Sequence, residues 1–365
     1  MNRKLQKILL FPLALIYGLV IRIRNLFFDT GLLKSTRFDL PVITVGNITV
    51  GGTGKTPHVE YLINLLKKQY NIAVLSRGYK RKTKNFLIVE PNDDVNTSGD
   101  EPLQVKLKHP DITVAVDRKR VNGVNQILLR NPATDVILLD DAFQHRHIEA
   151  GLSILLVNYN RLIYHDYILP AGRLREHRTS VKRADIVIIT KSPHDLSPDD
   201  LKGISGKIGL TPTQRLYFTG LTYEQPVKIF NLSKSVITMD QIRTELGNVI
   251  LVTGIAEPGP LINHLRENNL QVTHLAYPDH HIYSNEDFRQ IIDKYLSLPE
   301  GNRCLITTEK DAIRLRESMN ERDFPDDRLF YLRVNIVFLD NDAGGEFNKY
   351  ILDYVRKNKR NSSLS

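Results

Sequence analysis

The sequence is poor in cysteine and has no internal repetition, and both absences limit the class of protein. Cys304 is the only cysteine among 365 residues, which excludes internal disulfides and thiolate-rich metal sites and suits a reducing cytoplasm. We find no internal repeat or extended low-complexity segment, and 41% hydrophobic and 25% charged residues are typical of a globular protein. A chain of this length is expected to form two domains, or one large domain with a smaller one.

Acidic residues are also in deficit. The chain has 50 Lys and Arg residues against 41 Asp and Glu residues, a net charge of +9, which favours phosphorylated substrates, anionic lipid or nucleic acid as partners. The basic stretches at residues 80–84 and 118–120 contain no aromatic side chains, whereas nucleic-acid-binding segments often interleave the two. We therefore expect no nucleic-acid partner, and the sequence indicates no obligate protein partner.

Residues 8–21 form an almost uninterrupted apolar run. Cations flank it on both sides: Arg3, Lys4, Lys7, Arg22 and Arg24. At 14 residues the run is shorter than the ~20 residues that span a bilayer, Pro12 weakens a straight helix, and no signal-peptide cleavage site follows. We predict that residues 1–28 form a membrane-associating helix with its cations at anionic headgroups. A helix packed on the protein core and a true span are the alternatives.

Residues 46–57, GNITVGGTGKTP, have the pattern of a phosphate-binding loop. A β-branched apolar segment (40–45) precedes it and a segment with helical apolar spacing (57–68) follows, which predicts strand, glycine-rich turn and helix. Backbone N–H groups and the positive end of the helix then face one polyphosphate. Lys55 would reach its β- and γ-phosphates and the Thr56 hydroxyl would bind Mg²⁺, although Thr49 stands where the usual pattern has glycine. The predicted ATP-binding residues are Thr49, Val50, Gly51, Gly52, Thr53, Gly54, Lys55 and Thr56.

Strand and helix patterns alternate from this loop to about residue 190. The alternation predicts an α/β fold over residues 29–212, with a mostly parallel, P-loop NTPase-like sheet and helices on both faces. It returns on a smaller scale after residue 248, which predicts a second, smaller α/β domain over residues 213–337. Residues 215–222 and 329–337 are expected to form a two-stranded linker that returns the C-terminal residues 338–365 to the first domain.

Polar residues follow the predicted strand 136–139. Asp140 and Asp141 end this strand, where a carboxylate can bind Mg²⁺ beside the phosphate loop, although many strands end in Asp. Gln144 and His145 follow at the carboxyl end of the sheet, where ligands bind in such folds. Zinc at His145 and His147 is disfavoured because no Cys or further His is placed to complete a ligand set.

Three other places have residues that can carry chemistry. Asp100, directly before another acid and a proline, is our candidate for the base that takes the acceptor proton; the alternative is that it caps the following helix. Guanidinium groups at Arg173 and Arg175 can grip a phosphate, unless this is a solvated basic loop. Asp279 and His280 have the residue types that tune a proton acceptor, although a lone histidine is more often structural.

Seven short motifs occur in one order along the chain: GNITVGGTGKTP (46–57), SRGY (76–79), GDEP (99–102), DDAFQHR (140–146), PAGRLRE (170–176), PDH (278–280) and TEKD (308–311). Together they closely resemble the tetraacyldisaccharide 4′-kinase family, over about residues 8–315. The resemblance implies a two-domain kinase of lipid A biosynthesis that uses ATP and Mg²⁺. Its acceptor is the 4′-hydroxyl of a tetraacylated glucosamine disaccharide 1-phosphate. It also implies a peripheral location on the cytoplasmic face of the inner membrane of a Gram-negative-type bacterium, which suits an acceptor whose acyl chains stay in the bilayer.

The resemblance further implies roles for single residues. The family's catalytic Asp falls on Asp100 and its partner His on His280, although the neighbouring His281 leaves that choice open. Asp140, Asp141 and Glu176 fall in its metal and phosphate region, and with Thr56 of the loop they make up the predicted metal site. Arg120, Gln144, His145 and Arg175 fall nearby, and with Arg173 they are the predicted substrate and phosphate contacts.

A membrane-recruited P-loop ATPase switch is the alternative function. Such switches share the Gly-Gly-x-Gly-Lys-Thr pattern but place a lysine just before the paired glycines, where this chain has Val50. The sequence therefore favours the kinase.

Overall fold

A computed structural model of the chain describes residues 3–230, 237–318, 324 and 328–359. The chain divides into two compact units. The first comprises the chain up to Asn92, Val105–Gly220 and the chain from Ile336, and the second comprises Asp93–Gln104 and Leu221–Asn335. The segment that carries Asp100 therefore belongs to the second unit, whereas the ranges predicted from the sequence place it in the first.

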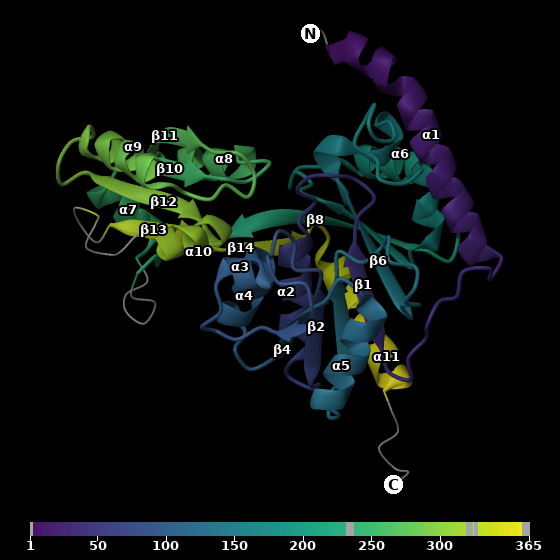
Figure 1. Cartoon of the computed structure of the whole chain (residues 1–365). Helices are drawn as coiled ribbons and strands as arrows, with labels where there is room; N and C mark the ends of the chain where they lie inside the picture. The colour runs from purple at the N-terminus through teal and green to yellow at the C-terminus, as the bar shows by residue number, and fades with distance from the viewer. Residues whose placement is uncertain (1–2, 231–236, 319–323, 325–327, 360–365) are drawn as a thin grey trace. The chain divides into compact units, whose positions relative to one another are not determined.

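The first unit is built on a nine-stranded sheet with the order β14-β8-β7-β6-β1-β5-β2-β4-β3 (Figure 1). Its strands are β1 (Val42–Gly46), β2 (Ile72–Ser76), β3 (Leu87–Ile88), β4 (Thr113–Val116), β5 (Val136–Asp140), β6 (Leu152–Asn158), β7 (Ile186–Thr190), β8 (Arg215–Tyr223) and β14 (Val334–Phe338). Neighbours from β8 to β4 pair in parallel, and β3 pairs antiparallel with β4. The inner parallel strands are continuous apolar runs because both faces of the sheet are covered.

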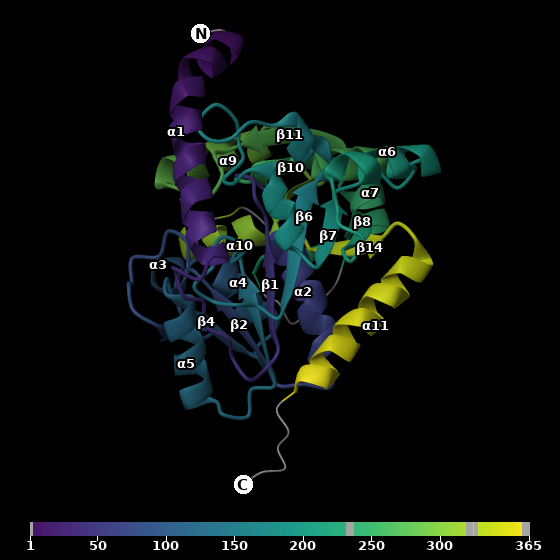
Figure 2. The ribbon, with the colours of Figure 1, turned by 90° about the vertical axis from the view of Figure 1, so that its right-hand side faces the viewer.

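Helices cover both faces of this sheet. They are α2 (Lys55–Leu66), α5 (Arg120–Arg130), α6 (Pro198–Ile208) and α11 (Asn341–Asn358), together with the end of α4 (Asp100–Lys108). Helix α1 (Arg3–Asp29) instead contacts loops of this unit. Val124 and Ile127 of α5 pack on Leu75 of β2 in one core cluster. Tyr61 of α2 meets Phe347 of α11, with 6.1 Å between ring centroids, and Figure 2 shows α5 and α11 on opposite sides of the sheet. The fold predicted from the sequence is confirmed.

The second unit has a five-stranded sheet with the order β11-β10-β12-β13-β9. Its strands are β9 (Val227–Lys228), β10 (Asn248–Thr253), β11 (Gln271–Ala276), β12 (Arg303–Thr308) and β13 (Leu329–Leu332), all parallel except the antiparallel pair β13–β9. Its helices are α3 (Val95–Ser98), α7 (Met239–Glu245), α8 (Gly259–Glu267), α9 (Asn285–Leu296) and α10 (Glu309–Ser318), with the start of α4. Ile250 of β10 packs with Tyr295 of α9, while the next residue, Leu251, packs with Leu265 of α8. Alternate residues of one strand thus serve two cores.

Residues 329–337, which the sequence analysis assigned to one linker strand, form two strands that separate at Arg333. Residues 329–332 are β13, which pairs with β12 in the second sheet, and all four of its residues are buried. Residues 334–338 are β14, which lies beside β8 in the first sheet. Alternating hydrophobicity runs through both strands, so the sequence pattern does not mark the point where the chain changes sheets.

The N-terminal helix α1 is continuous through Pro12. Its segment Leu9–Asp29 is long and apolar enough to cross a membrane by length and composition, with a mean hydropathy of 1.6. Ala14 and Phe28 are buried against the first unit, whereas Leu15, Ile16 and Leu19 are more than half exposed. Residues 1–2 and the side chains of residues 3–8, including the predicted flanking cations Arg3, Lys4 and Lys7, lie outside the described part of the chain.

Candidate active site

The phosphate loop connects β1 to α2. Gly54 adopts a left-handed conformation, with φ of 79°, immediately before α2 begins at Lys55. Glycine takes this conformation without a steric cost, and the turn places the predicted loop at the N-terminus of the helix. The sequence-predicted order of strand, glycine-rich turn and helix is therefore present, although the helix begins two residues earlier than expected.

Residues 173–175 lie along one side of the loop. The Val50 N–H donates to the Arg173 carbonyl at 2.9 Å, and the Arg175 N–H donates to the Ile48 carbonyl at 2.7 Å. Thr49 and Leu174 thus form an antiparallel bridge. This pairing brings the GNITVGGTGKTP and PAGRLRE motifs together.

Buried polar side chains support the loop from within. Asn47 donates to the Thr53 hydroxyl at 2.7 Å, Thr190 donates to the Thr53 carbonyl at 2.9 Å, and Asn158 donates to the Gly52 carbonyl at 3.2 Å. These bonds use loop carbonyls and a side chain, which is compatible with loop N–H groups facing a phosphate. Isolated Asn and Thr residues carry no local signal, so these supporting roles cannot be predicted from the sequence.

His58 holds the end of the loop from the first turn of α2. Its Nδ1 lies 2.7 Å from the Gly54 carbonyl and its Nε2 lies 3.0 Å from the Thr219 hydroxyl. A carbonyl only accepts, so Nδ1 carries the proton and Nε2 accepts from Thr219. Burial lowers the pKa of His58 to about 4, against a smaller opposing effect of the Gly54 hydrogen bond, so the ring is neutral at pH 7.

Asp141 lies between two cations of the site. Its carboxylate is 3.6 Å from Lys55 Nζ and 3.4 Å from Arg175 Nη1. Burial would raise the pKa of Asp141, but the charges of Lys55 and Arg175 outweigh burial and lower it. The carboxylate is therefore ionised at neutral pH and forms an ion pair with Lys55.

Arg120 and Asp140 are buried beside Asp141. Arg120 donates to the Asp140 carbonyl at 3.1 Å and also to the Asp117 carbonyl, and burial lowers its pKa to about 10. Ser76 donates to the Asp140 carboxylate at 3.2 Å. Burial, and then the charge of Arg120, lowers the pKa of His145 to about 4. Arg120 therefore interacts with both Asp140 and His145, and His145 is neutral at pH 7.

Glu176 lies in a different environment from the two predicted metal-site aspartates. It is buried and pairs with Arg183, and it accepts a hydrogen bond of 3.3 Å from Asn25 of α1. Among the residues that the structure describes, no group of three or more His, Cys, Asp or Glu side chains is spaced to hold a metal ion. The described geometry therefore brings Asp140 and Asp141 to the phosphate loop but does not group Glu176 with them.

Helix α1 contacts these same loops through polar side chains. Tyr17 donates to the Arg175 carbonyl at 3.1 Å, and Arg24 donates to the Gln144 carbonyl at 2.9 Å. The Gln144 amide in turn donates to the Asn47 carbonyl. One side of the apolar helix is thus tied to the residues around the phosphate loop, which the sequence analysis did not predict.

Asp100 lies in a second cluster, within the second unit. It is buried at the start of α4, and its Oδ2 accepts a hydrogen bond of 2.8 Å from His280 Nδ1. Arg314 also donates to this oxygen, and Lys310 Nζ lies 3.7 Å from it. His281 points elsewhere and pairs with Asp287 at 3.0 Å, so the geometry brings His280 to Asp100.

The cations of α10 set the charge of this cluster. Burial would raise the pKa of Asp100, but the hydrogen bond from His280 and the charges of Lys310 and Arg314 outweigh it and hold the pKa well below its usual range. Lys310 and Arg314 are four residues apart, so they lie on one face of α10. The TEKD motif contained Lys310 without a role, and the spacing to Arg314 is the signal that could have identified both.

A phosphate loop between a buried parallel strand and a helix, with acidic residues ending the neighbouring strand β5, defines an α/β protein of the P-loop NTPase-like class. The family model for LpxK, tetraacyldisaccharide-1-P 4′-kinase, matches residues 6–355. The chain belongs to this family, as the sequence motifs predicted.

Individual relatives match over nearly the whole chain. A tetraacyldisaccharide 4′-kinase of Phocaeicola vulgatus is 48% identical over 358 residues, 98% of this chain and 97% of the relative. The corresponding protein of Bacteroides thetaiotaomicron is 44% identical over 364 residues, 98% of this chain and 95% of the relative. The crystal structure of LpxK from Aquifex aeolicus in complex with ATP matches with a TM-score of 0.74 and 28% identity, over 96% of this chain and 99% of that chain.

Proposed function

We propose that this protein transfers the γ-phosphate of ATP to the 4′-hydroxyl of a tetraacylated glucosamine disaccharide 1-phosphate, a step of lipid A biosynthesis. The observation that carries the proposal is the family match over residues 6–355, a range that includes both the phosphate loop and the Asp100 cluster. The relatives named for this kinase cover the chain almost completely, and the similar Aquifex aeolicus protein was crystallised with ATP.

The phosphate loop holds the triphosphate in this proposal. Loop N–H groups of residues 51–56 and the N-terminus of α2 bind its oxygens, because the Val50 N–H is already bonded to the Arg173 carbonyl. Lys55 leaves Asp141 to contact the β- and γ-phosphates. Arg120, Arg173 and Arg175 supply further positive charge for the nucleotide or the acceptor phosphate. Gln144 and the neutral His145 can hydrogen-bond the acceptor without adding charge.

Mg²⁺ fits the donors at this site. Thr56 and the carboxylates of Asp140 and Asp141 offer hydroxyl and carboxylate oxygens, and Mg²⁺ usually takes one or two carboxylates together with water and substrate phosphates. A complete protein cage is therefore not required, in agreement with the donor set among the described residues. When bound, the ion would neutralise charge on the β- and γ-phosphate oxygens. Glu176, already paired with Arg183, acts in this proposal by anchoring α1 through Asn25.

The transfer itself breaks the bond between the γ-phosphorus and the β–γ bridging oxygen, whose electron pair stays on ADP. A new bond forms between that phosphorus and the 4′-oxygen, which gives up its proton. Asp100 accepts a hydrogen bond from the 4′-hydroxyl and takes the proton as the new bond forms. The depressed pKa of Asp100 makes it a weak base, which suits a loose transition state in which the hydroxyl proton leaves late. His280 orients the carboxylate through its hydrogen bond.

We further propose that α1 brings the enzyme to the cytoplasmic surface of the inner membrane. The exposed side of the helix carries apolar side chains: Leu9, Phe11, Leu13, Leu15, Ile16, Leu19, Val20, Ile23, Leu26 and Phe27. Such a face can enter one leaflet. The opposite side contacts the loops around the site through Tyr17 and Arg24, so membrane binding would place those loops near the lipid surface.

The test is transfer of radiolabelled γ-phosphate by the full chain to the disaccharide 1-phosphate in detergent micelles. We expect a product phosphorylated at the 4′ position and loss of transfer in Lys55→Ala. ATP turnover that is independent of the acylated disaccharide would instead favour the membrane-recruited ATPase switch. Stimulation by DNA in place of the lipid would overturn the expectation that nucleic acid is not a partner.

A further inference from the structure

Arg161 follows β6 in a short turn that is tied to the phosphate loop. The turn is the 3₁₀ helix Tyr159–Arg161, and the Asn158 side chain caps it by accepting from the Asn160 N–H at 2.9 Å. The same Asn158 side chain donates to the Gly52 carbonyl at 3.2 Å. One buried residue therefore sets the position of the loop and of the turn that carries Arg161.

The guanidinium of Arg161 lies against the loop backbone at Gly51. A Cβ atom on Gly51 would stand 3.0 Å from Arg161 Nη1, and Gly51 has a φ of 106°. A side chain at position 51 would thus be strained by the backbone and crowded by the guanidinium. Gly51 is four residues before Lys55, in the part of the loop that cradles the β- and γ-phosphates in enzymes of this class.

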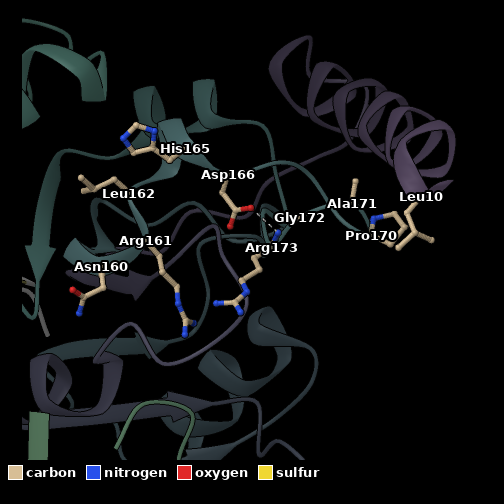
Figure 3. Close-up of a pocket in the computed structure, with 10 residues that line it drawn as sticks. All are labelled: Leu10, Asn160, Arg161, Leu162, His165, Asp166, Pro170, Ala171, Gly172 and Arg173. Carbon is tan, nitrogen blue, oxygen red and sulfur yellow. Dashed lines mark hydrogen bonds between the residues drawn. The ribbon is translucent and has the colours of Figure 1, made fainter. Parts of the chain in front are cut away.

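Arg173 lies near the same place. Arg161 and Arg173 both line a cavity of about 530 Å³, whose other lining residues include Asp166 and Leu10 of α1. The Arg173 N–H donates to Asp166 at 3.3 Å and its carbonyl accepts from Val50, which holds its backbone between the loop and the cavity. Figure 3 shows the two arginine side chains converging with their guanidinium ends close to each other in the view. Two converging cations beside a phosphate loop suit an anionic ligand.

We propose that Arg161 is an arginine finger supplied in cis, a catalytic residue whose guanidinium contacts the γ-phosphoryl group of ATP during transfer. It stabilises charge on the γ-phosphoryl oxygens while the bond to the β–γ bridging oxygen breaks and the bond to the acceptor oxygen forms. Arg161 takes no proton and forms no covalent bond. This inference rests on the kinase activity proposed above and adds to it a residue outside the seven motifs.

The experiment measures kcat, KM for each substrate and the Kd for ATP in Arg161→Lys and Arg161→Ala. We expect kcat to fall by about 10³-fold in Arg161→Ala, with the Kd for ATP changed only a few fold. Arg161→Lys should also lose most of the rate, because a lysine cannot make the bidentate contact of a guanidinium. The matched control is Arg37→Lys, at an exposed arginine of the same unit, which should keep the wild-type rate.

A rescue experiment separates chemistry from misfolding. Free guanidinium ion should restore part of the kcat of Arg161→Ala and leave the wild type unchanged, which a merely structural role would not produce. Unchanged kcat in both Arg161 variants would overturn the proposal.

The acceptor phosphate is the other anion that Arg161 could bind. If Arg161→Ala raised only the KM for the acceptor, and an acceptor lacking the 1-phosphate abolished that difference, the finger proposal would be wrong. If the wild type failed to phosphorylate the acceptor at all, the proposed function would fail instead. Slow hydrolysis of ATP by water would then still compare wild type and Arg161→Ala, with equal rates counting against the finger.

Discussion

Lys310 Nζ lies 3.2 Å from Nε2 of His280. The ionised Asp100 carboxylate only accepts, so Nδ1 of His280, 2.8 Å from it, carries the proton and Nε2 accepts from Lys310. The lysine thus supports the tautomer that orients Asp100, while Glu101 holds the same lysine at 2.9 Å. His280, Arg314 and Lys310 thus surround the Oδ2 atom of Asp100, and Glu101 holds the lysine from behind.

Replacing Asp100 tests whether that carboxylate takes part in the reaction. In Asp100→Asn we expect kcat to fall by on the order of 10²-fold or more, because an amide cannot take the proton of the 4′-hydroxyl. ATP binding should be largely retained, because the phosphate loop belongs to the first unit. Steady-state kinetics with a parallel ATP-binding measurement would check this, and near-normal turnover would reject Asp100 as the base.

The two adjacent histidines should respond differently. His280→Asn removes the hydrogen bond to Asp100 at Nδ1 and should lower kcat by roughly 10- to 100-fold. His281→Asn alters a residue that pairs with Asp287 at the start of α9, and its kcat should stay close to that of the wild type. The comparison is made on the purified variants at saturating ATP, and equal losses in both would contradict the geometry.

The charge of Lys310 should appear in the pH dependence. Lys310 helps to lower the pKa of Asp100, so the carboxylate of the wild type stays ionised as the pH falls. In Lys310→Met the pKa of Asp100 should rise, and the ionised base should be lost at a higher pH. The acid limb of the kcat profile should then move toward neutral pH, whereas Lys310→Arg should keep the wild-type limb. A profile unchanged in Lys310→Met would show that another group controls that limb.

His58 should make the fold sensitive to acid. Its pKa is lowered from 6.5 to about 4 in the folded state, so the unfolded chain binds the proton more readily between these values. The stabilisation is complete above pH 6.5 and is lost as the pH falls toward 4, a change of about 3 kcal/mol in the free energy of unfolding. Urea unfolding at several pH values would measure the slope, and His58→Gln should reduce it. An equal slope in the variant would assign the effect to other groups.

The exposed face of α1 should control membrane binding. Leu15→Glu combined with Leu19→Glu places charge on that face and should weaken flotation with anionic lipid vesicles several fold. Both side chains are more than half exposed, so the fold should tolerate the change, as a thermal melt would show. Leu129→Glu, at an exposed leucine of α5, is the matched control and should float like the wild type. Undiminished flotation of the double variant would remove α1 as the anchor.

The local elements of the site could be read from the sequence because they depend on neighbouring residues. The apolar β-branched run before residue 46, the glycines and the helical spacing after Lys55 each follow from backbone sterics and side-chain periodicity. The acids at the end of β5 were likewise predictable, because they directly follow a run of four apolar residues that reads as a buried strand. The seven motifs then allowed the family to be recognised, which the match over residues 6–355 confirms.

The contacts between these elements could not be read in the same way. Ile48 and Arg175 are joined by a backbone hydrogen bond, which leaves no trace in either side chain. Arg314 and Asp100 are 214 residues apart, and the ion pair between Glu176 and Arg183 likewise has no local signal. Electrostatic pairing of this kind depends on which loops the packed sheets bring together.

The order of amino acids by itself determined the phosphate loop, the alternation of strands and helices and the family, because each rests on short-range patterns. Tertiary structure alone decided that Asp100 packs with the second unit, that His280 rather than His281 meets it, and that Arg161 lies on Gly51. The physical reason is that burial and charge act between groups brought close by folding, regardless of their distance along the chain.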